Sequence, residues 1–204
     1  RKYHWNTSTI EDIEWELQAK YIKKQTYSRK KTLMKFIHRW LASGNKNFGQ
    51  KLMCPSCKQQ ENTGMDHDHF LTCYASGIRK QRRINLFTNL LHSLDTPHAL
   101  TTLLVHGLQS FYNSQSVNSH ASDQKAINHQ RKIGWNNFSR GRISKQFIIT
   151  MNEHYKQKKR TSSFTGIGWM KQVINFVLST HIDEWYNRCD SNSHPNQISF
   201  QNTF

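Results

Sequence analysis

Acidic side chains and long apolar runs are what this sequence has least of. Only 13 of its 204 residues are Asp or Glu, against 29 Lys or Arg, so the formal net charge is +16. No stretch approaches the roughly 20 apolar residues that a membrane-spanning helix needs. Apolar residues make up 35% of the chain, below the usual range of about 45–50%. We therefore expect helices over modest cores and no membrane span.

The groupings on which several classes of enzyme depend are also missing. Polymerase chemistry clamps two metal ions between carboxylates, and neither a Tyr/Phe-x-Asp-Asp box nor another plausible set of acids is present. Gly166-Ile167-Gly168 falls short of a phosphate-binding glycine loop and is better read as a helix start. No Ser or Cys stands with a strong base and an orienting acid. The main hypothesis therefore assigns no catalytic residue to this chain.

The abundant basic residues gather in four clusters. One cluster alone usually marks a solvated helix face, but four with so few balancing acids favour a polyanionic partner, RNA or DNA. A membrane surface is the weaker alternative, because no cluster lies on a strongly apolar amphipathic helix. The clusters are Lys23, Lys24, Arg29, Lys30, Lys31 and Lys35; Arg79, Lys80, Arg82 and Arg83; Arg140, Arg142 and Lys145; and Lys156, Lys158, Lys159 and Arg160. The second and third clusters supply the predicted nucleic-acid contacts.

Hydrophobic residues recur at helical spacing, and little strand patterning is visible. The predicted fold class is all-α, helical with a small structural zinc-binding module. Ser8 and Glu11 resemble a capping box that opens the first helix. Further helices are expected at about 28–41, from 69 to about 94 with a break near Gly77, from 97 to about 111, near 123–139, after 144, and at about 167–188.

Composition also suggests a domain organisation. The Ser- and Asn-rich residues 113–123 are the best linker candidate. The C-terminal part is expected to form a loosely attached helical bundle, and the polar tail to be disordered. The predicted parts are a helical region at 1–95 with the zinc-binding module at about 50–75, a connecting helix at 96–112, the linker, a C-terminal helical region at 124–190, and the tail at 191–204.

Three aromatic residues near the basic clusters are candidates for stacking on bases, namely Trp40, Trp135 and Phe138. Each also falls on an apolar helical face, which favours a place in the core. Trp169 and Trp185 are predicted to be core residues on the same grounds.

The sharpest pattern is Cys54-x2-Cys57-x11-His69-x3-Cys73. Two Cys in a tight turn can chelate one ion, and a helix places His69 and Cys73 on one face, so four ligands close a tetrahedral structural zinc site. His67 is a competing ligand that fits this face less well. Three Cys within twenty residues indicate a metal site in a reducing compartment, nucleus or cytoplasm, rather than a disulfide framework. Cys189 stands apart as an ordinary thiol.

These segments resemble a known family. Residues 34–41, ending in Trp40-Leu41, then Cys54-Pro55-Ser56-Cys57, then residues 68–73, are similar to the zinc-binding module that follows the reverse transcriptase domain of non-LTR retrotransposons. Residues 133–144 and 185–188 resemble segments further downstream in some of these elements. The resemblance implies binding of the element's RNA or target DNA, an upstream reverse transcriptase domain as partner, and no catalytic residue on this chain.

An enzyme is the alternative hypothesis. The segment Asp66-His67-Asp68-His69 after Cys54-x2-Cys57 looks like the core of HNH-type nucleases, in which a His activates water and an acid helps to hold a metal ion. Those proteins close their zinc site with a second C-x2-C, and Cys73 has no such partner here. The sequence therefore favours the structural zinc site.

Overall fold

The computed structural model describes residues 5–41, 54, 57, 68–115 and 124–193. Over these ranges the regular structure is helical, apart from an isolated antiparallel bridge between Ile13 and Ser144. The all-α prediction is confirmed. The elements in chain order are α1 (Thr7–Asp12), α2 (Trp15–Lys23), α3 (Tyr27–Ile37), α4 (His69–Thr72), the 3-10 turn η2 (Tyr74–Ser76), α5 (Gly77–Ser93), α6 (His98–Tyr112), α7 (Lys125–Ile133), α8 (Trp135–Phe138), α9 (Gln146–Gln157) and α10 (Gly166–Ser193).

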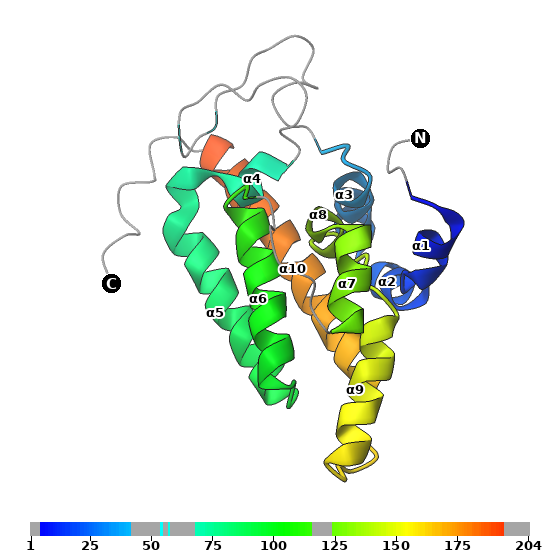
Figure 1. The fold of residues 1–204 in the computed structure, drawn as a ribbon. Helices are drawn as coiled ribbons and strands as arrows, with labels where there is room; N and C mark the ends of the chain where they lie inside the picture. Colours follow the sequence, from blue (N-terminus) through cyan, green and yellow to red (C-terminus); the bar gives the residue numbers. More distant parts are fainter. Residues whose placement is uncertain (1–4, 42–53, 55–56, 58–67, 116–123, 194–204) are drawn as a thin grey trace.

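The long helix α10 organises the arrangement, running through the middle of the molecule in Figure 1. It packs against α2, α3, α4, α5 and α9. Its core-facing side chains include Trp169, Ile174 and Trp185, with at most 9% exposed. One continuous hydrophobic cluster extends from Leu33 to Trp185. The two parts that composition separated at residues 113–123 therefore contribute to a single core.

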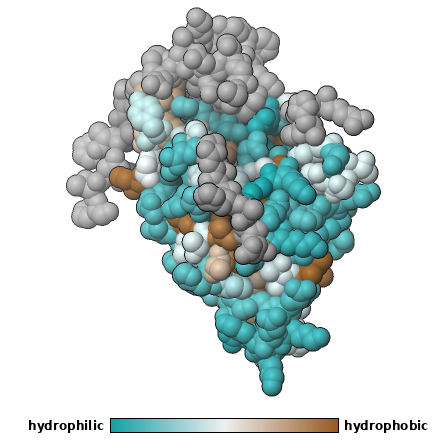
Figure 2. Space-filling model, in the orientation of Figure 1, coloured by the Kyte–Doolittle hydropathy of each residue, from teal (hydrophilic) through white to brown (hydrophobic). Residues whose placement is uncertain are grey.

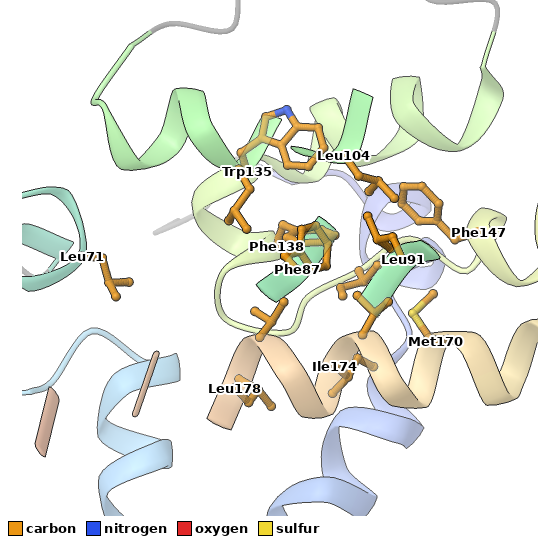
Figure 3. Close-up of a cluster of buried hydrophobic side chains, with 14 of the residues drawn as sticks. Leu71, Phe87, Leu91, Leu104, Trp135, Phe138, Phe147, Met170, Ile174 and Leu178 are labelled. Atoms are coloured by element: carbon orange, nitrogen blue, oxygen red, sulfur yellow. The ribbon is translucent and has the colours of Figure 1, made fainter. Parts of the chain in front are cut away.

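Aromatic packing fills the centre of this core (Figure 3). Phe87 of α5 meets Phe138 of α8 edge to face, with ring centroids 6.1 Å apart. Trp135 lies against α6 so closely that a Cβ on Gly107 would come within 2.2 Å of its indole ring. Only glycine fits there. The predictions that Trp135, Phe138, Trp169 and Trp185 are core residues are confirmed.

The first predicted helix start is wrong. Asn6, not Ser8, caps α1, and its side chain accepts a hydrogen bond from the Thr9 amide at 2.9 Å. The first helix is also short, because Ile13 leaves the helical conformation and forms an antiparallel bridge with Ser144. Glu14 then caps α2.

Two further helix boundaries differ from expectation. Gly77 does not break a helix but begins α5, and the interruption falls at Cys73, whose backbone is extended. The helix expected to reach residue 41 ends at Ile37, and Arg39 adopts a left-handed conformation with φ of 60°. Trp40 is therefore 60% exposed, and its prediction as a core residue is wrong.

The C-terminal boundary also moves. Helix α10 continues to Ser193, so the predicted disordered tail does not begin at residue 191. The rest of that prediction, residues 194–204, lies outside the described residues, as do most of the linker at 116–123 and much of the predicted module at 50–75.

Candidate metal centre

Four side chains converge at one end of the helical body to form a group that could hold a metal ion. Cys54 and Cys57 precede α4, His69 is its first residue, and Cys73 follows its last. One helical turn separates His69 from Cys73, and the Cys73 amide donates a hydrogen bond to the His69 carbonyl at 2.7 Å. The predicted i, i+4 placement of these two ligands is therefore confirmed.

Two of the distances between the candidate ligand atoms are close to those of a tetrahedral site. All four lie within 4.8 Å of one another. Cys54 Sγ and Cys73 Sγ are 3.8 Å apart, and Cys57 Sγ and His69 Nε2 are 3.4 Å apart. A tetrahedral site with bonds of about 2.3 Å to sulfur and about 2.0–2.1 Å to nitrogen spaces such atoms by about 3.8 and 3.6 Å. A disulfide would need sulfur atoms about 2.05 Å apart.

Two of the three thiols are buried from solvent. Cys54 and Cys73 are each only 2% exposed. Burial raises the pKa of the Cys73 thiol to about 12, and the neighbouring Cys54 and Cys57 act in the same direction. A bound cation reverses this effect, because it deprotonates a coordinating thiol.

Two other residues, His67 and Cys189, were considered for this site. His67, the competing ligand, lies outside the described residues. Cys189 is a half-buried cysteine on α10, forms no disulfide, and is not part of the group of four.

Asp68, directly before α4, anchors the centre to the body of the protein. Its carboxylate forms an ion pair with Arg140, whose side chain is only 1% exposed, and a longer one, 3.5 Å, with Arg39. Burial lowers the pKa of Arg140, and Asp68 opposes that shift. Both Asp68 oxygens thus face guanidinium groups, which leaves this acid poorly placed to hold a catalytic metal ion as the nuclease alternative requires. Asp66 lies outside the described residues.

Basic side chains of α5 cap the other end of α4. The last carbonyls of a helix lack partners within it. Lys80 Nζ donates to the Thr72 carbonyl at 2.7 Å, and Arg83 Nη2 donates to the Leu71 carbonyl at 3.3 Å. Glu184 of α10 bridges Arg79 and Arg83, each at 2.8 Å. Short α4 is therefore held at both ends by charged groups, Arg39 and Arg140 at its start through Asp68, and basic residues of α5 at its end.

These contacts give several residues of the basic clusters a structural role. Four of the seven predicted nucleic-acid contacts are buried: Lys80 at 9% exposure, Arg83 at 5%, Arg140 at 1% and Arg142 at 3%. A side chain bound inside the protein is not available to a phosphate in this conformation. The other three are exposed: Arg79, paired with Glu184; Arg82; and Lys145, which donates to the Glu11 carbonyl.

Arg142 is likewise buried and caps the end of another helix, α3. Its guanidinium donates to the Asn137 side chain at 2.9 Å and to the Ile37 carbonyl at the end of α3 at 3.1 Å. The sequence did not indicate this role, because a capping arginine and a phosphate-binding arginine look alike in one sequence.

A buried histidine lies between these elements. His181 of α10 makes hydrogen bonds with Tyr112 Oη at 2.6 Å and with the Ser139 carbonyl at 2.7 Å. Burial lowers the pKa of His181 to about 3, and the positive charges of Arg83 and Arg140 act in the same direction. The imidazole is therefore neutral at physiological pH, with Nδ1–H donating to Ser139 and Nε2 accepting from Tyr112.

This histidine makes the stability of the fold dependent on pH. An unfolded His titrates near pH 6.5, whereas folded His181 stays neutral until about pH 3. Its contribution is therefore complete above pH 6.5 and is lost as the pH falls from there toward 3. Between pH 7 and pH 5 we expect the free energy of unfolding to fall by about 2 kcal/mol from this residue alone.

Urea unfolding of wild type and His181→Phe at both pH values measures this loss. Other titrating groups affect the free energy of unfolding of both proteins alike. The difference between wild type and His181→Phe in the pH dependence of this free energy therefore isolates His181. Imidazole proton shifts from pH 7.5 to 5 provide a second measurement on wild type. A His181 resonance that titrates near pH 6.5 would contradict the prediction.

No family model, curated protein or solved structure matches this chain. In the part of the chain that the structure describes, none of the helices combines the length and apolar character needed to span a bilayer.

Proposed function

We propose that this chain is a zinc-stabilised, nucleic-acid-binding region of retrotransposon origin, located C-terminal to a reverse transcriptase domain. The observation that carries the proposal is the convergence of Cys54, Cys57, His69 and Cys73, whose ligand atoms lie within 4.8 Å of one another. It gives a three-dimensional counterpart to the pattern on which the family resemblance rests. The role proposed is binding, with no catalytic residue on this chain.

The chemistry of the four ligands favours zinc. Three thiolates and one imidazole are soft or borderline ligands, and their tetrahedral arrangement suits Zn²⁺. Four protein ligands leave no position for a substrate or water, so the ion would have a structural role. Reduced thiols of this kind are expected in the nucleus or cytoplasm.

The surface charge supports a nucleic-acid partner. The net charge is +16, and many of the lysines are exposed, among them Lys31 and Lys35 of α3 and those of the loop after α9. The face in Figure 2 is largely hydrophilic, most evenly so at the protruding tip where α9 ends. Such a surface attracts phosphate backbones without base-specific contacts.

Fluorescence anisotropy with labelled RNA and DNA oligonucleotides tests the proposal. We expect a Kd in the micromolar range or below at low salt. Affinity should fall steeply with added salt, because each neutralised phosphate releases condensed counterions. Scrambling the oligonucleotide sequence should change the affinity little. Absent binding, or an affinity independent of salt, would contradict a role in nucleic-acid binding.

A further inference from the structure

One exposed surface combines apolar and basic side chains in a way that packing does not explain. Helix α3 buries Leu33, Phe36 and Ile37. On its outer side Tyr27 is 82% exposed, and Met34 and Trp40 are 42% and 60% exposed. These three line a shallow groove together with Lys30, Lys31, Lys35 and His38. We call this set of seven residues the α3 platform.

The end of α3 fixes the position of the tryptophan. The Trp40 amide donates to the Lys35 carbonyl at 2.6 Å, and the Arg39 amide donates to the Phe36 carbonyl at 3.1 Å. These two bonds, with Arg39 left-handed, form a Schellman motif, which turns the following residue back along the helix. Trp40 therefore returns to the outer side of α3 instead of continuing into the core.

Two aromatic rings of the platform are already in contact with each other. The rings of His38 and Trp40 lie 5.6 Å apart, centroid to centroid, with an interplanar angle of 36°. With 60% of Trp40 exposed, part of the indole remains open to a planar partner. Tyr27, at the other end of the helix, offers a second exposed ring.

The platform also has uncompensated charge. In the described ranges no ion pair joins Lys30, Lys31 or Lys35 to an acidic side chain. Arg29, on the same helix but turned toward α10, pairs with Asp183 at 2.8 Å. The acid thus compensates the inward-facing cation, while Lys31 and Lys35 are exposed beside the rings and Lys30 is half-buried next to them.

We infer that the α3 platform binds single-stranded nucleic acid, with bases stacked on Trp40 and Tyr27 and phosphates held by Lys30, Lys31 and Lys35. The inference rests on the proposed nucleic-acid binding and assigns it a place and a strand type. Exposed rings beside lysines recognise unpaired bases because every base offers a π-face. A duplex stacks those faces on one another, so it could use only the lysines. Anionic lipid is disfavoured because the strongly apolar face of α3 points into the core.

The first test compares single-stranded and duplex probes on the full chain purified with zinc. The probes are labelled 20-nucleotide oligo(dT) and oligo(rU), and a 20-base-pair DNA. We expect Trp40→Ala to weaken binding of both single strands by about fivefold or more and to leave duplex binding nearly unchanged. Trp40→Phe should retain most of the affinity. Ile167→Ala, which removes an apolar side chain that is 57% exposed elsewhere, is the control.

The second test separates local contacts from net charge. A triple alanine variant of Lys30, Lys31 and Lys35 is compared with one of Lys156, Lys158 and Lys159, exposed lysines at and after the end of α9, far from α3 in Figure 1. Both remove three positive charges. We expect the α3 variant to bind oligo(dT) at least tenfold more weakly than the other and to lose more of the salt dependence.

Several outcomes would overturn the inference. If the two triple variants lost affinity for oligo(dT) equally, and Trp40→Ala bound like wild type, the proposed nucleic-acid binding would stand. The α3 platform would then not be its site. The surface would be assigned to membranes if the α3 variants lost binding to phosphatidylserine–phosphatidylcholine vesicles but kept oligonucleotide binding. A wild type that binds no probe would overturn the proposed function as well. Circular dichroism of each variant confirms that the fold is kept.

Discussion

Replacing Cys73 by serine is expected to abolish metal binding and to unfold much of the protein. Cys73 contributes one of four ligand atoms, and its sulfur lies 3.8 Å from that of Cys54. Zinc binding to a structural site contributes about 10–16 kcal/mol to folding in small domains. That figure matches or exceeds the whole stability of about 5–15 kcal/mol expected of a native protein.

Native mass spectrometry and circular dichroism of the full chain measure the effect. Wild type should hold one zinc ion, and Cys73→Ser none, with a clear loss of helical signal. Cys189→Ser is the matched control, because this thiol stands outside the group of four and its replacement should keep both the ion and the helicity. A fully helical Cys73→Ser protein without zinc would show that the centre is dispensable for folding.

The second large effect is expected at the ion pair that anchors the centre. Asp68→Ala should lower the free energy of unfolding by about 3–5 kcal/mol, because it leaves the charge of Arg140 buried without its carboxylate. Arg140 is 1% exposed, and its side chain also donates to the Asn136 carbonyl. Zinc affinity should fall too, since Asp68 immediately precedes His69.

A double-mutant cycle with Arg140→Met separates this pair from its surroundings. The two replacements together should cost about 1–3 kcal/mol less than the sum of the single costs, because no unpaired charge then remains. Urea unfolding of the four zinc-loaded proteins provides the values. Strictly additive losses would mean that Asp68 and Arg140 stabilise the protein independently.

The features that the sequence predicted well depend on local spacing. Apolar residues at helical intervals located most of the helices, including the long one that became α10. The metal ligands were accessible for the same reason, because a C-x2-C turn and an i, i+4 pair each act within a few residues. Only the meeting of the two pairs required the fold.

The features that it missed depend on partners far away in the chain. Arg140 pairs with Asp68 across 72 residues, and Arg79 with Glu184 across 105. Their sequence neighbours resemble those of any exposed basic residue, so periodicity could not separate capping arginines from surface ones. Trp40 was misplaced for a smaller reason. The left-handed turn at Arg39 ends the helix early, and nothing in the residue type requires that turn.

The central position of α10 has a consequence for how the protein is made. Helices α2 and α3 both pack on α10, but more than a hundred residues separate them from it in the chain. At synthesis rates of about 5–20 residues per second, the ribosome delivers α10 roughly seven to thirty seconds after α3. During that interval the apolar sides of the early helices lack their main partner. Nascent chains of this protein should therefore be clients of chaperones until α10 emerges.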